Sequence, residues 1–218
     1  MKKSLFILVC LATTAFTSQA QKTRFGFTGG VVFANYHAEV DGESGKGDTK
    51  SGVTAGLLAD IPLSSHFSFQ PALNFTQKGM AEKEIYLGIT EKSSLRINCI
   101  EVPLNVLYNV SSNTGNFFIG AGPSLAFHVS GKWKFNDGSE STSSDVKFGN
   151  TDEDHFKSMD FGANFLTGYS FPNGLMLAVN YNLGLSNLFT EENDNSTMKS
   201  SYFGIKLGFL LNSMKNRK

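Results

Sequence analysis

Apolar and polar residues alternate with a period of two along most of the chain, and the pattern is clearest between residues 160 and 188. Phe161, Phe165 and Tyr169 fall on one side of this stretch, whereas small or polar residues fall on the other. The segment 172–174, Pro-Asn-Gly, interrupts the alternation, which then resumes. Alternation of this kind predicts two strands joined by a hairpin turn. Each arm has about 11 residues, the length that a tilted strand needs to cross a bilayer.

The same alternation predicts eight strands in the whole chain. They cover approximately residues 24–36, 51–61, 66–78, 95–110, 117–135, 160–171, 175–185 and 201–211. The connections alternate strictly between long and short, and the long ones are polar. Bacterial outer-membrane barrels show this asymmetry, because their periplasmic turns are short and their outer loops are long. We therefore predict an all-β fold, an eight-stranded antiparallel up-and-down transmembrane β-barrel with four outer loops and both termini facing the periplasm.

The strand predicted at residues 95–110 contains an irregularity. Its apolar residues occupy odd positions up to Cys99 and even positions from Ile100 onward. One extra residue in a strand shifts the alternation in this way. The sequence thus predicts a β-bulge between Cys99 and Ile100, which would turn Glu101 and Asn105 inward.

The composition agrees with a narrow barrel. The 218 residues carry equal numbers of acidic and basic side chains, so the net charge gives no sign of a nucleic-acid partner, and the length fits one domain. Glycine (22 residues) and phenylalanine (20 residues) are both abundant, which suits a barrel with small residues inside and rings outside. Eight strands enclose an interior only wide enough for side chains, so we do not expect an open channel.

The N-terminus has the pattern of a secretory signal. Two lysines precede a short apolar core at residues 5–12, and Ser-Gln-Ala at residues 18–20 provides a cleavage site of small residues. The apolar core is too short for a transmembrane helix. We expect residues 1–20 to be a cleaved signal peptide and residues 21–218 to form one outer-membrane β-barrel domain.

The two cysteines offer no evident chemistry. Cys10 lies inside the apolar core of the signal, where a lipidation signal would not place it. Removal of the signal leaves Cys99 alone, and a single cysteine cannot form an intramolecular disulfide. We expect Cys99 to behave as a small apolar residue on a strand.

Three segments carry a resemblance to a known family: INCIEVPLNVLYNV (97–110), FFIGAGPSLAFHVSGKWK (117–134) and DFGANFLTGYSFPNGLMLAVNYNLGLSNL (160–188). They resemble the I-x-Y-x-E-I-P-L-x-x-K-Y, aromatic-G-x-G-P and D-x-G-x-x-x-G-x-G-aromatic segments of the PorT-like outer-membrane β-barrel family of Gram-negative bacteria. Cys99 stands where the family often has an aromatic residue, and Leu107 stands where it often has lysine. The resemblance implies an outer-membrane barrel without a catalytic motif. Some members of the family assist a secretion system that exports proteins across the outer membrane.

Charged residues on the inward side of the predicted strands are the first candidates for chemistry. They are Asp60, Arg96, Glu101, Lys132, Lys134, Asp160 and Lys206. In a narrow, poorly solvated interior, opposite charges pair because an unmatched buried charge is costly. We therefore predict a structural network in the lumen. The alternatives are a path for protons or ions and catalysis.

The chain has four histidines, His37, His66, His128 and His155. The predicted topology places His37 and His155 in outer loops and His66 at a turn. His128 should lie inside, on the same strand face as Ser124 and Ser130. A Ser–His pair is found in lipid hydrolases, but such a pair needs an orienting acid and access to the lipid surface. We expect a lumen histidine hydrogen-bonded to its neighbours.

The third long loop is rich in acidic residues, namely Asp145, Asp152, Glu153 and Asp154. It lacks the ligand spacing of a calcium-binding loop. We expect a solvated surface there, with contact to lipopolysaccharide-bound cations as the alternative.

Large aromatic residues near strand ends or faces are Tyr36, Trp133, Tyr169, Tyr181 and Tyr202. Several of them are expected to form the aromatic girdles found at both interfaces of a membrane barrel. Trp133, between Lys132 and Lys134, has the pattern of an anchor at headgroup level.

Together these features favour a structural or interaction role at the cell envelope. We expect a monomer in the cell outer membrane, in contact with outer-membrane lipids and with a protein partner through the outer loops or periplasmic turns. The role would be adhesion, envelope integrity or docking to a secretion complex. No catalytic residue, cofactor, metal site or nucleic-acid partner is expected. The alternatives are a small-solute pore, a lipid-modifying outer-membrane enzyme and a soluble lipocalin-like barrel, whose large apolar residues would point inward.

Overall fold

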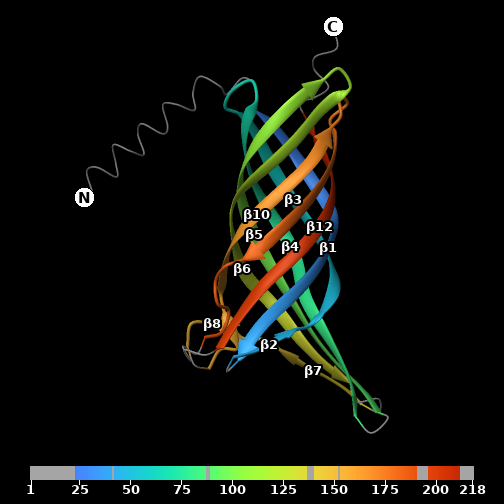
Figure 1. The fold of residues 1–218 in the computed structure, drawn as a ribbon, viewed down its shortest axis with the longest axis vertical. Helices are drawn as coiled ribbons and strands as arrows, with labels where there is room; N and C mark the ends of the chain where they lie inside the picture. Colours follow the sequence, from blue (N-terminus) through green and yellow to red (C-terminus); the bar gives the residue numbers. More distant parts are fainter. Residues whose placement is uncertain are drawn as a thin grey trace, which may run out of the picture.

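The computed structural model describes residues 23–40, 42–86, 89–136, 140–151, 153–190 and 196–211, so the predicted signal peptide lies outside the described residues. The chain forms a barrel of antiparallel strands (Figure 1). The strands of its wall are β1 (Arg24–Val40), β3 (Asp48–Pro62), β4 (Phe67–Tyr86), β5 (Ile89–Ser112), β6 (Gly115–Asn136), β10 (Met159–Ser170), β11 (Leu175–Gly184) and β12 (Ser196–Leu210). Shorter strands in the connections are β2 (Glu43–Lys46), β7 (Ser141–Asp145), β8 (Phe148–Gly149) and β9 (Phe156–Lys157).

Hydrogen bonding closes the eight wall strands into a ring. Each wall strand pairs antiparallel with its neighbours in chain order, and β1 pairs with β12 along the register from Gly26↔Leu210 to Val40↔Ser196. Closure leaves the wall without a free edge to aggregate. The predicted eight-stranded up-and-down barrel is confirmed.

The two ends of the barrel differ. Short turns at residues 63–66, 113–114 and 171–174 lie at the turn end, which is the upper end in Figure 1. The other connections lie at the opposite, loop end. The sequence predicted a long loop at residues 79–94, but β4 and β5 continue through this stretch as a paired ladder that reaches Tyr86↔Ile89. Glu82 and Lys83 point to opposite faces of β4 and are both exposed, so the apolar alternation stops there although the hydrogen bonds continue.

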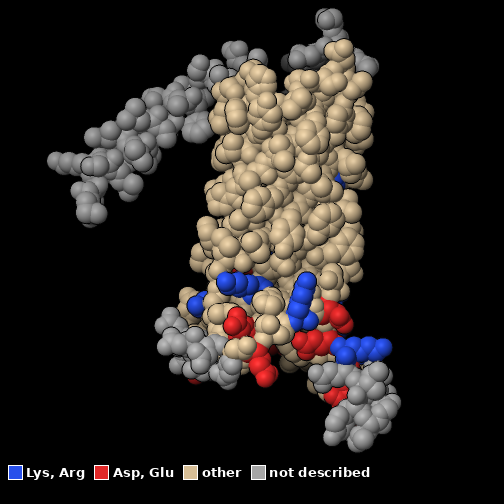
Figure 2. Space-filling view, viewed as in Figure 1, with Lys and Arg blue, Asp and Glu red and all other residues tan. Residues whose placement is uncertain are grey.

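An apolar belt surrounds the outside of the wall. It consists of the outward-facing Phe, Leu, Val and Ile side chains, of which Leu57 is 64% and Leu207 is 59% exposed. On the face shown in Figure 2, Lys, Arg, Asp and Glu gather at the loop end and are nearly absent from the wall above it. An apolar exterior of this kind is typical of a barrel that crosses a membrane and contradicts the lipocalin-like alternative. Among the described residues, no helix is both long and apolar enough to span a bilayer.

The predicted bulge between Cys99 and Ile100 is wrong. The pairing of β5 with β6 passes from Asn98↔Ser130 to Cys99↔His128, so the extra residue is Val129 in β6. The apolar residues at odd positions before Cys99 do not face lipid, because they pack inside the barrel.

The strand β5 therefore keeps its phase, and Glu101 and Asn105 point inward as predicted. In β6 the phase reverses after Val129. Lys132 and Lys134 are consequently exposed on the outside, whereas Trp133 packs against an inner apolar cluster.

The interior has an apolar cluster at each end and polar side chains between them. The cluster near the turn end contains Leu58, Leu107, Phe118, Met176, Ala178 and Leu210. The cluster near the loop end contains Tyr36, Met80, Leu95, Ile97, Phe156, Leu188 and Met198. The Sγ atom of Cys99 is buried and donates a hydrogen bond to the carbonyl oxygen of Thr76 at 3.2 Å. The bore is thus more apolar at its ends than the alternation alone predicted.

Candidate functional site

An ion pair lies inside the barrel and joins strands that are not neighbours. Lys78 Nζ on β4 lies 3.3 Å from Asp160 Oδ2 on β10, and both side chains are almost fully buried. Ser200 on β12 donates to the same carboxylate oxygen at 2.6 Å, and Ser186 donates to Oδ1 at 2.9 Å. Because the charges are paired and hydrogen-bonded, the cost of burying them is offset. This arrangement joins β4, β10 and β12 across the lumen.

A second group of polar residues is centred on Glu101, which is 1% exposed. Tyr202 donates to Glu101 Oε1 at 2.7 Å, and Asn182 lies 3.4 Å from the same oxygen. Asn182 also donates to Ser124 at 2.6 Å. In the ring order, β5 with Glu101 and β12 with Tyr202 are opposite walls, so this hydrogen bond crosses the bore.

Amide side chains extend the network toward the turn end. Asn164 donates to Asn105 at 2.9 Å, and Asn180 donates to Asn164 at 3.0 Å. All three side chains are buried. Buried polar side chains thus bond to one another in the interior between the two apolar clusters.

The prediction for inward charges is confirmed for part of the set. Asp60, Glu101 and Asp160 are buried inside, and Lys206 faces inward, whereas Arg96, Lys132 and Lys134 are on the outside. Near the turn end, Asp60 forms a salt bridge of 2.5 Å with Arg24.

Sequence reasoning missed Lys78 as an inward charge. Lys78 continues the even-numbered inward positions of β4 after Asn74 and Thr76, which could have identified it.

The histidines do not form a hydrolytic site. His128 is buried as predicted, and its Nδ1 donates to the carbonyl oxygen of Lys157 at 2.8 Å. Ser124 is bonded to Asn182, and Ser130 points outward because of the bulge at Val129. The Ser–His pair considered from the sequence is thus not assembled.

The other histidines lie at the surface. His37 and His155 are exposed at the loop end, and His66 is in a turn, where Ser65 Oγ lies 2.9 Å from its Nδ1. The predicted positions of His66 and His155 are confirmed, whereas His37 lies on β1 and not in a loop, because β1 continues to Val40.

The predicted aromatic girdle is correct only in part. Tyr181 is 44% exposed on the outer wall, and Tyr169 is partly exposed near the turn end. Tyr36 and Tyr202 are buried inside the barrel, and Trp133 also points inward. These three are therefore packing residues and not anchors at the membrane interface.

The acidic third loop does not gather its carboxylates. Asp145 and Glu153 are exposed, and Asp152 lies outside the described residues. Asp154 accepts hydrogen bonds from the side chain and amide of Thr151, at 2.6 and 3.1 Å, and these bonds lower the pKa of its carboxyl group. Within the described ranges, no group of three His, Cys, Asp or Glu residues could hold a metal ion.

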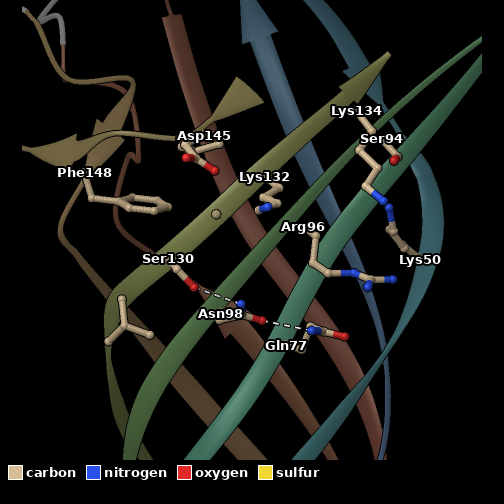
Figure 3. A pocket seen from close by; sticks show the side chains of 13 residues that line it. Lys50, Gln77, Ser94, Arg96, Asn98, Ser130, Lys132, Lys134, Asp145 and Phe148 are labelled. Carbon is tan, nitrogen blue, oxygen red and sulfur yellow. Dashed lines mark hydrogen bonds between the residues drawn. The ribbon is translucent and has the colours of Figure 1, made fainter. Parts of the chain in front are cut away.

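A basic groove of about 570 Å³ lies on the outer wall toward the loop end (Figure 3). Its cationic residues are Lys50 on β3, Arg96 on β5, and Lys132 and Lys134 on β6, and Asp145 is the acidic residue among those that line it. Arg96 and Lys132 are paired in register, so their side chains leave adjacent strands side by side. Arg96, Lys132 and Lys134 were predicted to face the lumen, which is wrong, and the alternation gives no sign of the groove.

The side of the groove nearest the apolar belt is a row of hydrogen-bonded polar side chains. Gln77 donates to Asn98, and Asn98 donates to Ser130, both at 2.9 Å (Figure 3). Val129 and Phe148 add apolar surface next to this row. The groove therefore combines positive charge, amide and hydroxyl groups, and an apolar edge.

Comparison with known proteins gives a family match. The model of a family described as "Outer membrane protein beta-barrel domain" matches residues 18–190. No curated protein matches the sequence.

Similar solved structures include the outer membrane protein OprG from Pseudomonas aeruginosa, with 10% identity and a TM-score of 0.44 over 86% of this chain and 95% of that chain. Neisserial surface protein A (NspA) has 12% identity and a TM-score of 0.42 over 86% and 97%. Ail, the attachment invasion locus protein of Yersinia pestis, solved with the heparin analogue sucrose octasulfate, has 11% identity and a TM-score of 0.35 over 86% and 99%.

Proposed function

The chain belongs to the family of outer membrane protein beta-barrel domains, and from this membership we propose that it is a closed, non-enzymatic barrel with a structural or interaction role at the cell envelope. It is located in the outer membrane. In our proposal the turn end faces the periplasm and the loop end faces the exterior, and the protein is a monomer. Adhesion, envelope integrity and docking to a secretion complex are the roles considered, and the PorT-like resemblance favours docking.

The observation that supports an interaction role is the hairpin of β4 and β5. The strand β5 has 24 residues, about twice the number that a tilted strand needs to cross the bilayer. β3 pairs with β4 only as far as Asp48↔Ala81, and the hairpin beyond Ala81 and Ser94 extends past β3 at the loop end (Figure 1). A closed barrel without free edges holds a paired hairpin in a fixed position, where it can serve as a binding surface.

The test of this role is to shorten the hairpin. Ala81 and Ser94 are paired in register, so residues 82–93 can be replaced by Asn-Gly, which favours the two-residue turn of a hairpin. A photo-crosslinking residue at the exposed position Glu39→X is retained in both forms, and Lys83→X reports on the hairpin itself. We expect a discrete protein adduct at position 83 in cells, and loss of the associated envelope phenotype in the shortened protein.

The matched control places the same crosslinker at Phe165, which is half exposed on the apolar belt and should form no protein adduct. Circular dichroism verifies that the shortened barrel is folded. A folded, shortened protein that retains full function, together with no adduct at position 83, would contradict an interaction through the hairpin.

The closed bore gives a separate test against the pore alternative. Hydrogen bonds join opposite walls at Glu101 and Tyr202, and an ion pair spans the lumen at Lys78 and Asp160. We expect purified protein to be silent in planar bilayers. A stable unitary conductance that changes when Lys78 is replaced by Ala would support a pore and overturn the closed barrel.

We also propose that residues 1–20 are removed during export. N-terminal sequencing of the protein from outer membranes should begin at Gln21. A first residue upstream of Gln21 would contradict the proposed cleavage site.

A further inference from the structure

The basic groove concentrates positive charge on three strands of the outer wall. Lys50 lies over Gly79, where a Cβ atom would be 3.0 Å from Lys50 Cδ, and Gly79 is paired with Arg96. The glycine thus lets the Lys50 side chain run along the wall toward Arg96. Partial burial, and then the positive charges of Arg96 and Lys134, lower the pKa of Lys50.

The basic residues outnumber the acidic one among those that line the groove, four to one, with Asp145 as the acidic residue. The salt bridges Arg24–Asp60 and Lys78–Asp160 lie elsewhere in the barrel. An anion in the groove would relieve the repulsion among the like charges. Arg is the side chain best suited to a phosphate, because its planar guanidinium donates two parallel hydrogen bonds.

The groove lies at the level of the lipid headgroups. The nearest outward residues of the apolar belt are Phe75, Ile100 and Val129, and the Gln77–Asn98 pair follows two residues beyond the first two. Two residues of a strand span about 7 Å. Arg96 lies two residues beyond Asn98, and the other cations lie near it. The cations are therefore about 10 Å beyond the belt when the strand tilt of about 40° is included.

We propose that the basic groove binds a phosphorylated saccharide lipid of the outer leaflet, of the lipid A class. Its phosphate groups contact Arg96, Lys132 and Lys50. The sugar hydroxyls meet the row formed by Gln77 and Asn98, and the acyl chains continue along the apolar belt. This inference concerns the side of the barrel and goes beyond the proposed role of the hairpin.

The experiment uses the folded, mature protein in detergent micelles. Diphosphorylated lipid A is added, and native mass spectrometry measures the bound fraction. We expect the double variant Arg96→Gln/Lys132→Gln to bind about tenfold more weakly, because two charge-assisted contacts to phosphate are lost. The matched control is Lys46→Gln/Lys199→Gln, which removes the same charge from exposed positions on β2 and β12 and should change affinity by less than about twofold.

A gain-of-binding variant guards against effects of misfolding. Asp145→Asn removes the acidic group from the groove and should tighten the binding of lipid A. Dephosphorylated lipid A should bind the unmodified protein as weakly as lipid A binds the double variant. Millimolar inorganic phosphate should not displace the bound lipid.

Three results would overturn the proposal. One is an equal loss of affinity in the double variant and in the matched control. Another is equal binding of lipid A with and without its phosphates. The third is displacement by inorganic phosphate alone, which would assign the groove to free anions and not to a lipid.

Discussion

Tyr202 and Tyr181 lie on neighbouring strands but on opposite sides of the wall. Tyr202 is 1% exposed and donates to buried Glu101, whereas Tyr181 is 44% exposed on the apolar belt. We predict that Tyr202→Phe lowers the free energy of unfolding by about 1–3 kcal/mol, because Glu101 loses its shortest hydrogen bond. The matched variant Tyr181→Phe should change it by less than about 0.5 kcal/mol. Urea unfolding in lipid vesicles measures both, and equal values would contradict the assigned role of Tyr202.

The pKa of Asp154 provides a second prediction at the residue scale. Its carboxylate is stabilised by hydrogen bonds from Thr151, so its pKa is lowered. The stabilisation is fully present above the ordinary aspartate pKa and is lost as the pH falls through the lowered pKa. We expect Thr151→Val to return the Asp154 pKa toward its ordinary value and Thr151→Ser to leave it low. NMR titration decides this, and an ordinary Asp154 pKa in the unmodified protein would contradict the prediction.

At the residue scale the sequence was informative only where the alternation was regular. Glu101 and Asp160 were assigned inward correctly, and Lys78 could have been assigned by the same pattern. Trp133 and Lys132 were assigned to the wrong sides because the phase of β6 changes at Val129. The groove could not be predicted, because it depends on the register that brings β3, β5 and β6 together.

At the scale of elements, the bulge in β6 determines which side chains of this strand face outward near the loop end. Removal of Val129 would restore one-to-one pairing of β6 with β5, and Trp133 would stay inward and Lys132 outward, because the residues beyond the bulge already have this register. We predict that the deletion variant folds and keeps Trp133 packed against the inner apolar cluster. Val129→Ala keeps the bulge and is the control.

The chain's single tryptophan makes the side on which Trp133 lies measurable. Its fluorescence should be quenched by aqueous iodide to the same extent in the deletion variant and in the control. Stronger quenching in a folded deletion variant would show that Trp133 has turned outward and would contradict a bulge at Val129.

The length of β4 and β5 shows another limit of the sequence. Period-two alternation identifies a strand only where its two faces meet different environments. In the hairpin, Glu82 and Lys83 point to opposite faces and are both exposed, so the ladder that begins at Ala81↔Ser94 has no such signal there. The membrane-crossing parts of the same strands were predicted correctly because one face meets lipid.

At the scale of the whole molecule, the barrel and its orientation in the bilayer follow from the alternation. The test uses spin labels at Phe165 and Val179, attached to cysteines in a Cys99→Ser background that keeps a hydrogen-bond donor at position 99. We expect lipid-soluble oxygen to relax both labels and an aqueous nickel chelate to have little effect, because both residues lie on the apolar belt. A label at exposed Lys92 should show the reverse.

Strong access of the nickel chelate to positions 165 and 179 would place them in water and contradict the orientation. The fold as a whole was predictable because every crossing strand repeats the same signal. The hydrogen bonds and the ion pair inside the barrel were not predictable, because they depend on which strands face each other across the closed ring.

The bonds that cross the lumen also determine how the protein can fold. Lys78 contacts Asp160 and Ser200, which are 82 and 122 residues away along the chain, and Glu101 contacts Tyr202 at a separation of 101. Contacts between such distant segments slow folding, because a large loop must close before they form. Until β10 is in place, Lys78 has no counter-charge, and Glu101 lacks the hydrogen bond from Tyr202 until β12 is in place. Folding should therefore be cooperative and should be completed only when β12 pairs with its neighbours. A chain that ends before β12 should be degraded and should not accumulate as a partly folded sheet.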